Sequence, residues 1–199
     1  MVTIKLDKVG KKFNKKWIFR SVSHSLTNEH HYSVVGHNGS GKSTLLQIIS
    51  SFMLPSEGAV EYNIDDIEIS NDKIYHHLSF AAPYMELIEE FKLIEVLDFH
   101  QKIKGFKKPL LPQDIISLMG FEAQKNKAVK NFSSGMKQRL KLALAFYSDT
   151  SILLLDEPTS NLDQQGINWY QTQLSEHSKD RLVIICSNHK KEDLFSCSK

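Results

Sequence analysis

The stretch Gly36-His37-Asn38-Gly39-Ser40-Gly41-Lys42-Ser43-Thr44 decides the fold, because it matches the pattern G-x-x-x-x-G-K-[S/T]. An apolar run at 32–35 leads into it, and apolar residues follow at helical spacing from 45 to 52. A glycine-rich turn between a strand and a helix lets backbone N–H groups converge on phosphate oxygens. Lys42 would bring a positive charge to the β- and γ-phosphates, and the Ser43 hydroxyl would ligate Mg²⁺. The sequence therefore predicts a phosphate-binding loop.

A second polar site follows the apolar run at 152–155, which ends in the paired carboxylates Asp156 and Glu157. By itself such a pair is better explained as a solvated acidic turn. Downstream of a phosphate-binding loop, it is better explained as a metal ligand followed by a base. Asp156 would hold Mg²⁺ directly or through water, and Glu157 would polarise the attacking water.

Composition excludes several classes of protein. The chain has 199 residues, of which 41% are hydrophobic, and a formal net charge of +2, which gives no case for binding nucleic acid. No apolar run is long enough to cross a bilayer, and the N-terminus lacks the apolar segment of a signal peptide. The two cysteines, Cys186 and Cys197, show no metal-ligand or disulfide spacing, so we expect reduced thiols in the cytosol.

The predicted architecture is an α/β domain, since strands that end in polar residues feed helices. We expect one domain, 1–199, with a mainly parallel core sheet and an N-terminal antiparallel part in 1–82 and 133–199. A helical insertion is expected at about 83–132. The other expected elements are strands at 2–9, 17–26, 58–64 and 182–186, and helices at 91–103, 112–119 and 136–147.

A third motif carries a family resemblance. The stretch Asn131-Phe132-Ser133-Ser134-Gly135-Met136-Lys137-Gln138-Arg139 resembles the signature segment of ABC-type ATPases, L-S-G-G-Q followed by a basic-Gln-Arg helix start. Ser133 and Gly135 match that pattern, whereas Phe132, Ser134 and Met136 depart from it. Alone, the stretch is equally well explained as a helix capped by a serine. Its place shortly before Asp156 favours the signature segment.

Three further features fit the same family. Ser160-Asn161-Leu162-Asp163 resembles the D-loop, which places Asp163 at the nucleotide. His189 follows the strand at 182–186 and resembles the switch histidine, which would position the γ-phosphate and the water. Phe13 lies where the family has an aromatic side chain that stacks on adenine. Trp17 is the alternative for that role, and Phe13 could equally belong to the core.

One part of the family pattern is missing. The family has a glutamine at the end of a strand near position 83, where it touches Mg²⁺ and the attacking water. This chain has Phe80-Ala81-Ala82-Pro83-Tyr84 instead. Either Pro83 or Tyr84 aligns with the glutamine, and neither side chain ligates Mg²⁺ well. The departure puts in doubt how the outer shell of the metal and the link to the helical insertion are made.

The resemblance implies the fold of a P-loop NTPase of the ABC ATPase type, with ATP and Mg²⁺ as ligands. Two such domains pair head to tail in this family, so Ser133 and the N–H of Gly135 would grip a γ-phosphate across the interface. The implied partners are a second ATPase subunit, identical or different, and an integral membrane permease subunit. The expected location is cytoplasmic, at the inner face of the cell membrane.

Two other functions remain open at this stage. Some ABC ATPases are not transport subunits, and one that serves cofactor assembly would have the same motifs. A nucleotide-dependent regulator with slow turnover would be consistent with the missing glutamine. The leading hypothesis is the energising ATPase subunit of a transporter.

Overall fold

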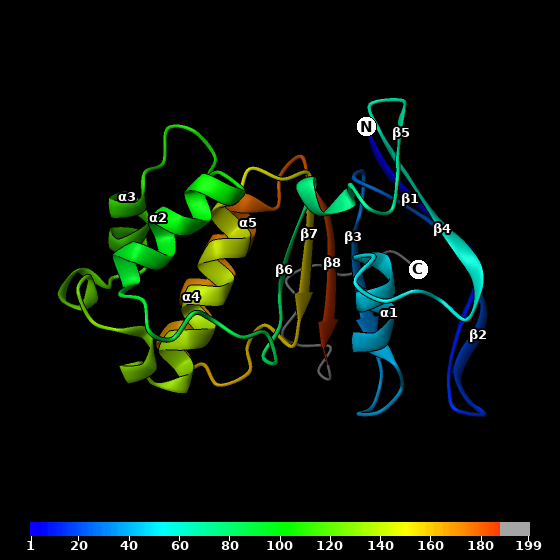
Figure 1. The fold of residues 1–199 in the computed structure, drawn as a ribbon, viewed down its shortest axis with the longest axis horizontal. Helices are drawn as coiled ribbons and strands as arrows, with labels where there is room; N and C mark the ends of the chain where they lie inside the picture. The colour runs from blue at the N-terminus through cyan, green and yellow to red at the C-terminus, as the bar shows by residue number, and fades with distance from the viewer. Residues whose placement is uncertain (188–199) are drawn as a thin grey trace. The chain divides into compact units, whose positions relative to one another are not determined.

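The protein is described by a computed structural model, which covers residues 1–187 of the 199. By the density of its contacts the chain divides into two compact units. The first unit comprises Met1–Phe80, Thr150–Glu157 and, of the described residues after 179, 180–187. The second unit comprises Ala81–Asp149 and Pro158–Lys179. Figure 1 shows the helices and strands of both units.

An antiparallel sheet forms the N-terminal part of the first unit. Its strands, in the order β2-β1-β4-β5, are β2 (Lys16–Thr27), β1 (Val2–Phe13), β4 (Glu57–Ile64) and β5 (Ile67–Ile69). Successive side chains of β1 alternate between the two faces of the sheet, so Ile4 and Leu6 are buried on one face whereas Lys5 between them is exposed on the other. Ile4 lies between Leu26 of β2 and Tyr62 of β4 in the two registers.

The second sheet of this unit has apolar strands that end in polar residues. Its order is β3-β8-β7-β6, with β3 (His31–Val35), β8 (Leu182–Ser187), β7 (Ile152–Asp156) and β6 (Leu78–Ala81). β8 runs parallel to both of its neighbours, and the register pairs Val35 with Ser187 and Asp156 with Cys186. The carboxyl ends of β3, β7 and β8 therefore lie at one edge, and α1 (Lys42–Ile49) follows β3 from that edge.

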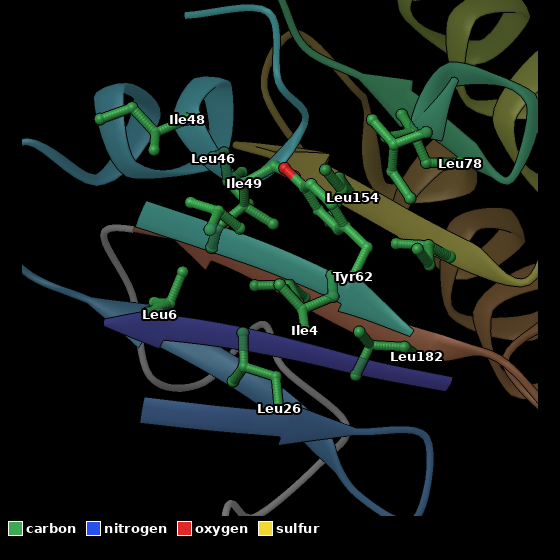
Figure 2. Close-up of a cluster of buried hydrophobic side chains, with 14 of the residues drawn as sticks. Ile4, Leu6, Leu26, Leu46, Ile48, Ile49, Tyr62, Leu78, Leu154 and Leu182 are labelled. Atoms are coloured by element: carbon green, nitrogen blue, oxygen red, sulfur yellow. The ribbon is translucent and has the colours of Figure 1, made fainter. Parts of the chain in front are cut away.

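The core of the first unit is filled by side chains from both sheets and from α1. Figure 2 shows Ile4 and Tyr62 of the antiparallel sheet, Leu154 and Leu182 of the parallel sheet, and Leu46 of α1 in one cluster. Burial of each such side chain stabilises the fold by about 1.5–3 kcal/mol. The Tyr62 hydroxyl donates to the carbonyl of Ile49 at 3.0 Å, and burial raises the pKa of Tyr62 to about 12.

The second unit is helical. Its helices are α2 (Leu93–Ile103), α3 (Pro112–Leu118), α4 (Ser134–Tyr147) and α5 (Gln164–His177). α4 packs against α5 through rings, since Phe146 contacts Trp169 and Tyr170 with centroids 6.2 and 6.0 Å apart. The buried Tyr147 hydroxyl donates to Gln173 Oε1 at 2.6 Å. This pairing holds α4 in a fixed register along α5.

The elements expected from the sequence are confirmed within a few residues at each end, and β5 and α5 were not anticipated. The helical insertion expected at 83–132 falls within the second unit, which also includes α4 and α5. The core expected at 133–199 is therefore divided between the units, because α4 and α5 bury their apolar faces against each other. A single domain spanning 1–199 stays a prediction. Along 1–187, no helix is both long and apolar enough to cross a membrane.

Candidate nucleotide-binding site

The loop between β3 and α1 has a backbone that side chains at its glycines would disturb. Gly41 precedes α1 with φ 96°, and a Cβ there would lie 2.5 Å from Ile18 Cγ2. At Gly36 a Cβ would lie 2.7 Å from Ser40 Oγ. The first turn of α1 has no acidic residue and no side-chain cap. The loop is thus shaped to receive an anion at the positive end of α1.

Lys42 is the buried cation of this loop, with 8% of its surface exposed. Its Nζ donates to the carbonyl oxygens of Gly36 at 2.7 Å and His37 at 3.3 Å. Its distance to Glu157 Oε1 is 3.8 Å, at the long end for an ion pair. Carbonyls of the loop itself therefore hold the ammonium at the loop, where it can meet a phosphate.

Asp156 ends β7 as a buried and unpartnered carboxylate. It is 1% exposed, and neither Oδ1 nor Oδ2 has a hydrogen-bond partner among the residues described. A buried negative charge without a partner costs several kcal/mol, roughly, unless a cation compensates it. This donor set fits Mg²⁺, which is commonly held by one or two carboxylates together with phosphates. No group of three or more His, Cys, Asp or Glu side chains within 1–187 could hold a metal unaided.

Glu157 follows with a backbone φ of 42°, in the left-handed region that most residues avoid. Its N–H donates to the carbonyl of Cys186 at 2.8 Å, which anchors the residue to the end of β8. Its side chain is 28% exposed, so it can reach solvent and also lies near Lys42. The left-handed backbone at Glu157 ends the alternation of side chains between the two faces of the sheet, so the side chains of Asp156 and Glu157 need not point to opposite faces.

Of the two candidates for the adenine, Phe13 has the more accessible ring. Its side chain is exposed to 46%, with Lys11 Nζ 5.3 Å from the ring centroid. The ring of Trp17 carries the Arg20 guanidinium at 4.3 Å and Lys12 Nζ at 5.3 Å. A core role for Phe13 does not fit this exposure, and adenine stacking by Phe13 remains a prediction.

The signature and D-loop residues meet in a pocket of about 390 Å³ within the second unit. Among its lining residues are Ser133, Gly135, Asn161 and Asp163. Ser133 caps α4, since its Oγ accepts from the N–H of Met136 at 3.2 Å, and Asp163 caps α5 by accepting from Gly166 N at 2.7 Å. The helix-cap explanation of Ser133 is therefore correct, and it is compatible with a signature role. The pocket lies between the N-termini of two capped helices.

Gly135 is required by the close approach of the D-loop. A Cβ at Gly135 would lie 2.8 Å from the carbonyl oxygen of Asn161. The backbone of Asn161 is in the left-handed region, with a φ of 64°. Buried Gln138 fastens the start of the same segment, because its Nε2 donates to the carbonyl of Pro158 at 3.0 Å. The signature segment and residues 158–163 therefore hold each other in place.

Arg139 is a pocket residue to which the sequence assigned no role. Its guanidinium lies 4.6 Å from the ring centroid of Trp169 and 5.5 Å from that of Phe121. Burial lowers the pKa of Arg139, and Asp163 partly counters that shift. Arg139 stands in the quoted motif, but Phe121 and Trp169 are far from it in sequence, so no local pattern reveals the three-residue stack.

Two expectations concern residues elsewhere. His189 lies outside the described residues. Pro83 and Tyr84 follow β6 after one intervening residue, Ala82, and the carbonyl of Pro83 accepts from Lys141 Nζ at 2.6 Å. That this turn stands where the family has its glutamine remains a prediction.

Comparison with known proteins identifies the family to which the chain belongs. Residues 19–160 match the family described as ABC transporter. The chain belongs to this family. It is 33% identical over 199 residues to the "Uncharacterized ABC transporter ATP-binding protein YybJ" of Bacillus subtilis (strain 168), and the match covers 97% of this chain and 88% of that protein. The chain is accordingly an ATPase of the ABC type.

Further likenesses agree with this family. The "Cytochrome c biogenesis ATP-binding export protein CcmA" of Histophilus somni (strain 129Pt) is 26% identical, with 94% of this chain and 87% of that protein covered. The solved "Dimeric Structure of MJ0796, a Bacterial ABC Transporter Cassette" superposes with a TM-score of 0.79 at 24% identity, covering 95% of this chain and 89% of that one. The latter likeness shows that the fold is that of an ABC ATPase cassette, as the sequence predicted.

Proposed function

We propose that this protein is the ATP-binding and hydrolysing subunit that energises a membrane ABC transporter, through ATP-driven pairing with a second ATPase subunit. The observation that carries the proposal is the unpartnered, buried Asp156 beside Glu157 and Lys42 in the first unit. These groups supply a metal ligand, a proton acceptor and a phosphate-binding cation. Their arrangement suits hydrolysis of a magnesium-bound phosphate ester or anhydride.

The residues of the first unit divide the work as follows. The N–H groups of 36–44 and the Lys42 ammonium would hold the β- and γ-phosphates, and Ser43 with Asp156 would hold Mg²⁺. Bound Mg-ATP supplies the phosphoanhydride to be cleaved and a cation that offsets its charge. Glu157 would accept a proton from the attacking water, and His189 would position the water and the γ-phosphate. Phe13 would stack on the adenine.

The second unit supplies the half-site that a dimer needs. In the described chain, the signature pocket is lined by residues of 121–166 and by none of 36–44. Family membership and the solved cassette of similar fold, which is named as dimeric, support a head-to-tail pair, in which this chain's Ser133 and Gly135 serve the nucleotide held by the second subunit. ATP then favours the closed pair, and hydrolysis releases it. The second subunit can be identical to this chain or different.

The transport role rests on family membership and on the names of relatives. Two relatives that cover most of the chain are named as an ABC transporter ATP-binding protein and as an ATP-binding export protein. We therefore place the chain at the cytoplasmic face of a membrane, bound to an integral membrane permease subunit. A role in cofactor assembly is the alternative. A regulator with slow turnover is a second alternative, favoured by the lack of a metal-ligating side chain at Pro83 and Tyr84.

The deciding experiment measures phosphate release with Mg-ATP in the parent, Glu157→Gln and Lys42→Ala. Loss of a general base lowers the rate by on the order of 10²–10⁴. Glu157→Gln should therefore turn over very slowly, bind ATP like the parent, and accumulate as a dimer in light scattering. Lys42→Ala should not bind Mg-ATP tightly. A matched control is Glu68→Gln, which removes an exposed carboxylate from β5.

Parental turnover in Glu157→Gln would refute the role of Glu157 as the base and leave His189 as the next candidate. The transport role has its own test. The tagged protein is purified from membranes, and a polytopic membrane protein should co-purify and stimulate phosphate release. Hydrolysis that is complete and unchanged without any membrane component would favour cofactor assembly.

A further inference from the structure

The turn that replaces the family's glutamine is fastened to the helix that carries the signature segment. Ala82 is fully buried behind the end of β6, and the N–H of Met85 donates to its carbonyl at 3.2 Å to form a turn. Pro83 within the turn has no N–H to donate, and its ring restricts Ala82 to extended backbone. The carbonyl of Pro83 is therefore a polar group presented in a fixed direction at the strand end.

Lys141 of α4 meets this carbonyl directly. Its Nζ donates to Pro83 O at 2.6 Å in a partly buried setting. Burial, and secondarily the charge of Lys137, lower the pKa of Lys141. A hydrogen bond from an ammonium is about twice as strong as one between neutral groups. The contact is thus a strong point of attachment between the turn and α4.

A second lysine on the same face of α4 holds the other end of the same segment. Lys137 precedes Lys141 by one helical turn, and its Nζ forms an ion pair with Glu89 Oε1 at 2.5 Å. A backbone hydrogen bond also holds Glu89, since Lys130 N donates to Glu89 O at 2.8 Å. Two like charges at this spacing repel each other in a helix. Here each has an acceptor in the segment 82–90, which offsets the repulsion.

We propose that Lys141 is a positioning residue that couples the turn after β6 to the signature helix α4, in the place where this chain lacks the family's glutamine. α4 begins at the Ser133 cap, so a displacement of the turn at Pro83 is passed along the helix axis to the signature pocket. The inference rests on the proposed function, because its readouts are turnover and ATP-driven dimerisation.

The test compares Lys141→Met, which keeps the apolar stem, with Lys141→Arg, which keeps the charge and the donors. Removing a hydrogen bond from a charged group typically costs on the order of ten-fold or more in an equilibrium constant. We expect Lys141→Met to lower kcat roughly ten-fold while KM for ATP stays within about two-fold, since no part of the phosphate loop is touched. Lys141→Arg should recover most of the loss. Lys102→Met, on the exposed side of α2, is the matched control.

A second readout separates positioning from chemistry. In a Glu157→Gln background, Lys141→Met should raise the protein concentration needed for half-maximal ATP-dependent dimerisation by roughly ten-fold. A lowered Tm with unchanged kcat and unchanged dimerisation would overturn the proposal, as would Lys141→Arg behaving like Lys141→Met. If Lys141→Met does not fold, Lys141→Gln, which keeps an amide donor without the charge, takes its place in the comparison.

The two proposals fail in different ways. If the parent protein shows no phosphate release that the Lys42→Ala substitution abolishes, the proposed function and this inference both fail. Lys42-dependent release that is insensitive to Lys141→Met would overturn the positioning role alone. Restoring the glutamine by Pro83→Gln in the Lys141→Met variant should return part of the lost turnover, and no recovery would show that Lys141 does not act in the place of that side chain.

Discussion

Substitution of Gly135 by alanine tests whether the signature pocket is built for a ligand or only for folding. The added Cβ would lie 2.8 Å from the carbonyl oxygen of Asn161, whereas ordinary contacts begin near 3.4 Å. The obstacle is backbone, so the D-loop or the start of α4 must retreat by about half an ångström. Ser133, the cap of α4, and Asp163, the cap of α5, lie in the same pocket. Both ends of the pocket would therefore shift.

Two opposing terms set the expected stability change. Overpacking costs about 1–3 kcal/mol, whereas alanine is about 1 kcal/mol better than glycine inside a helix. The free energy of unfolding should therefore fall by about 2 kcal/mol at most, which lowers Tm by less than roughly 8 °C in a chain of this size. A catalytic misplacement of about 1 Å can cost 10²-fold. Half that shift predicts roughly a ten-fold loss of dimer affinity or more.

The assay compares the dimer fraction with Mg-ATP by light scattering, in a Glu157→Gln background, with ATP affinity measured separately. Gly135→Ala should bind ATP normally and dimerise poorly. The control is Gly105→Ala, where φ is 80° and no atom lies within 4 Å of the added Cβ. That variant strains the backbone without crowding the pocket, so it should lower Tm and leave dimerisation intact. Parental dimerisation of Gly135→Ala at lowered Tm would refute a ligand role for the pocket.

Three other predictions follow from single groups. Asp156→Asn should raise Tm without nucleotide, because it removes a buried charge that costs roughly several kcal/mol. It should also weaken Mg²⁺-dependent binding, and calorimetry with and without Mg-ATP measures both effects. Phe13→Ala should raise KM for ATP roughly 5- to 100-fold with little change in kcat, whereas an equal effect of Trp17→Ala would assign the adenine to Trp17. Burial lowers the pKa of His100 from 6.5 to about 4, so on acidification the unfolded chain binds the proton before the folded chain does. The free energy of unfolding should therefore fall by ~3 kcal/mol at most as the pH drops from about 6.5 to about 4. Denaturation midpoints against pH should lose that slope in His100→Gln, and a slope that persists would assign it to other groups.

Burial, and secondarily the charge of Lys104, explain why the neutral form of His100 is favoured. The Ser148 hydroxyl donates its proton to the carbonyl of Leu144 at 2.5 Å, so it must accept from His100 Nε2 at 2.7 Å. The ring also stacks on Phe106 with centroids 5.2 Å apart. A protonated ring would be desolvated in this place without gaining an acidic partner from Ser148 or Phe106. The acid sensitivity is therefore a property of the packed second unit.

Local motifs were sufficient for the phosphate loop and for the carboxylates of β7. A glycine-rich turn binds phosphate through its own backbone, so a strand before residues 36–44 and a helix after them are enough to predict that role, which stays a prediction. The apolar run at 152–155 likewise predicted both a buried strand and the place of Asp156 at its end. In both cases the determining interactions span only a few residues, which is why the order of the residues reveals them.

Contacts between residues distant in sequence were decided by the tertiary structure alone. The sequence predicted Asp163 beside the nucleotide, but only the packing of α4 on α5 brought it into one pocket with Gly135. Likewise, nothing near Pro83 in the sequence indicates that Lys141, from another helix, holds its carbonyl. Such pairs form when chain entropy is overcome by burial over whole helix faces, and no local pattern encodes that balance. Sequence alone therefore determined which chemical groups the protein has, and the packing of its helices decided which of them meet.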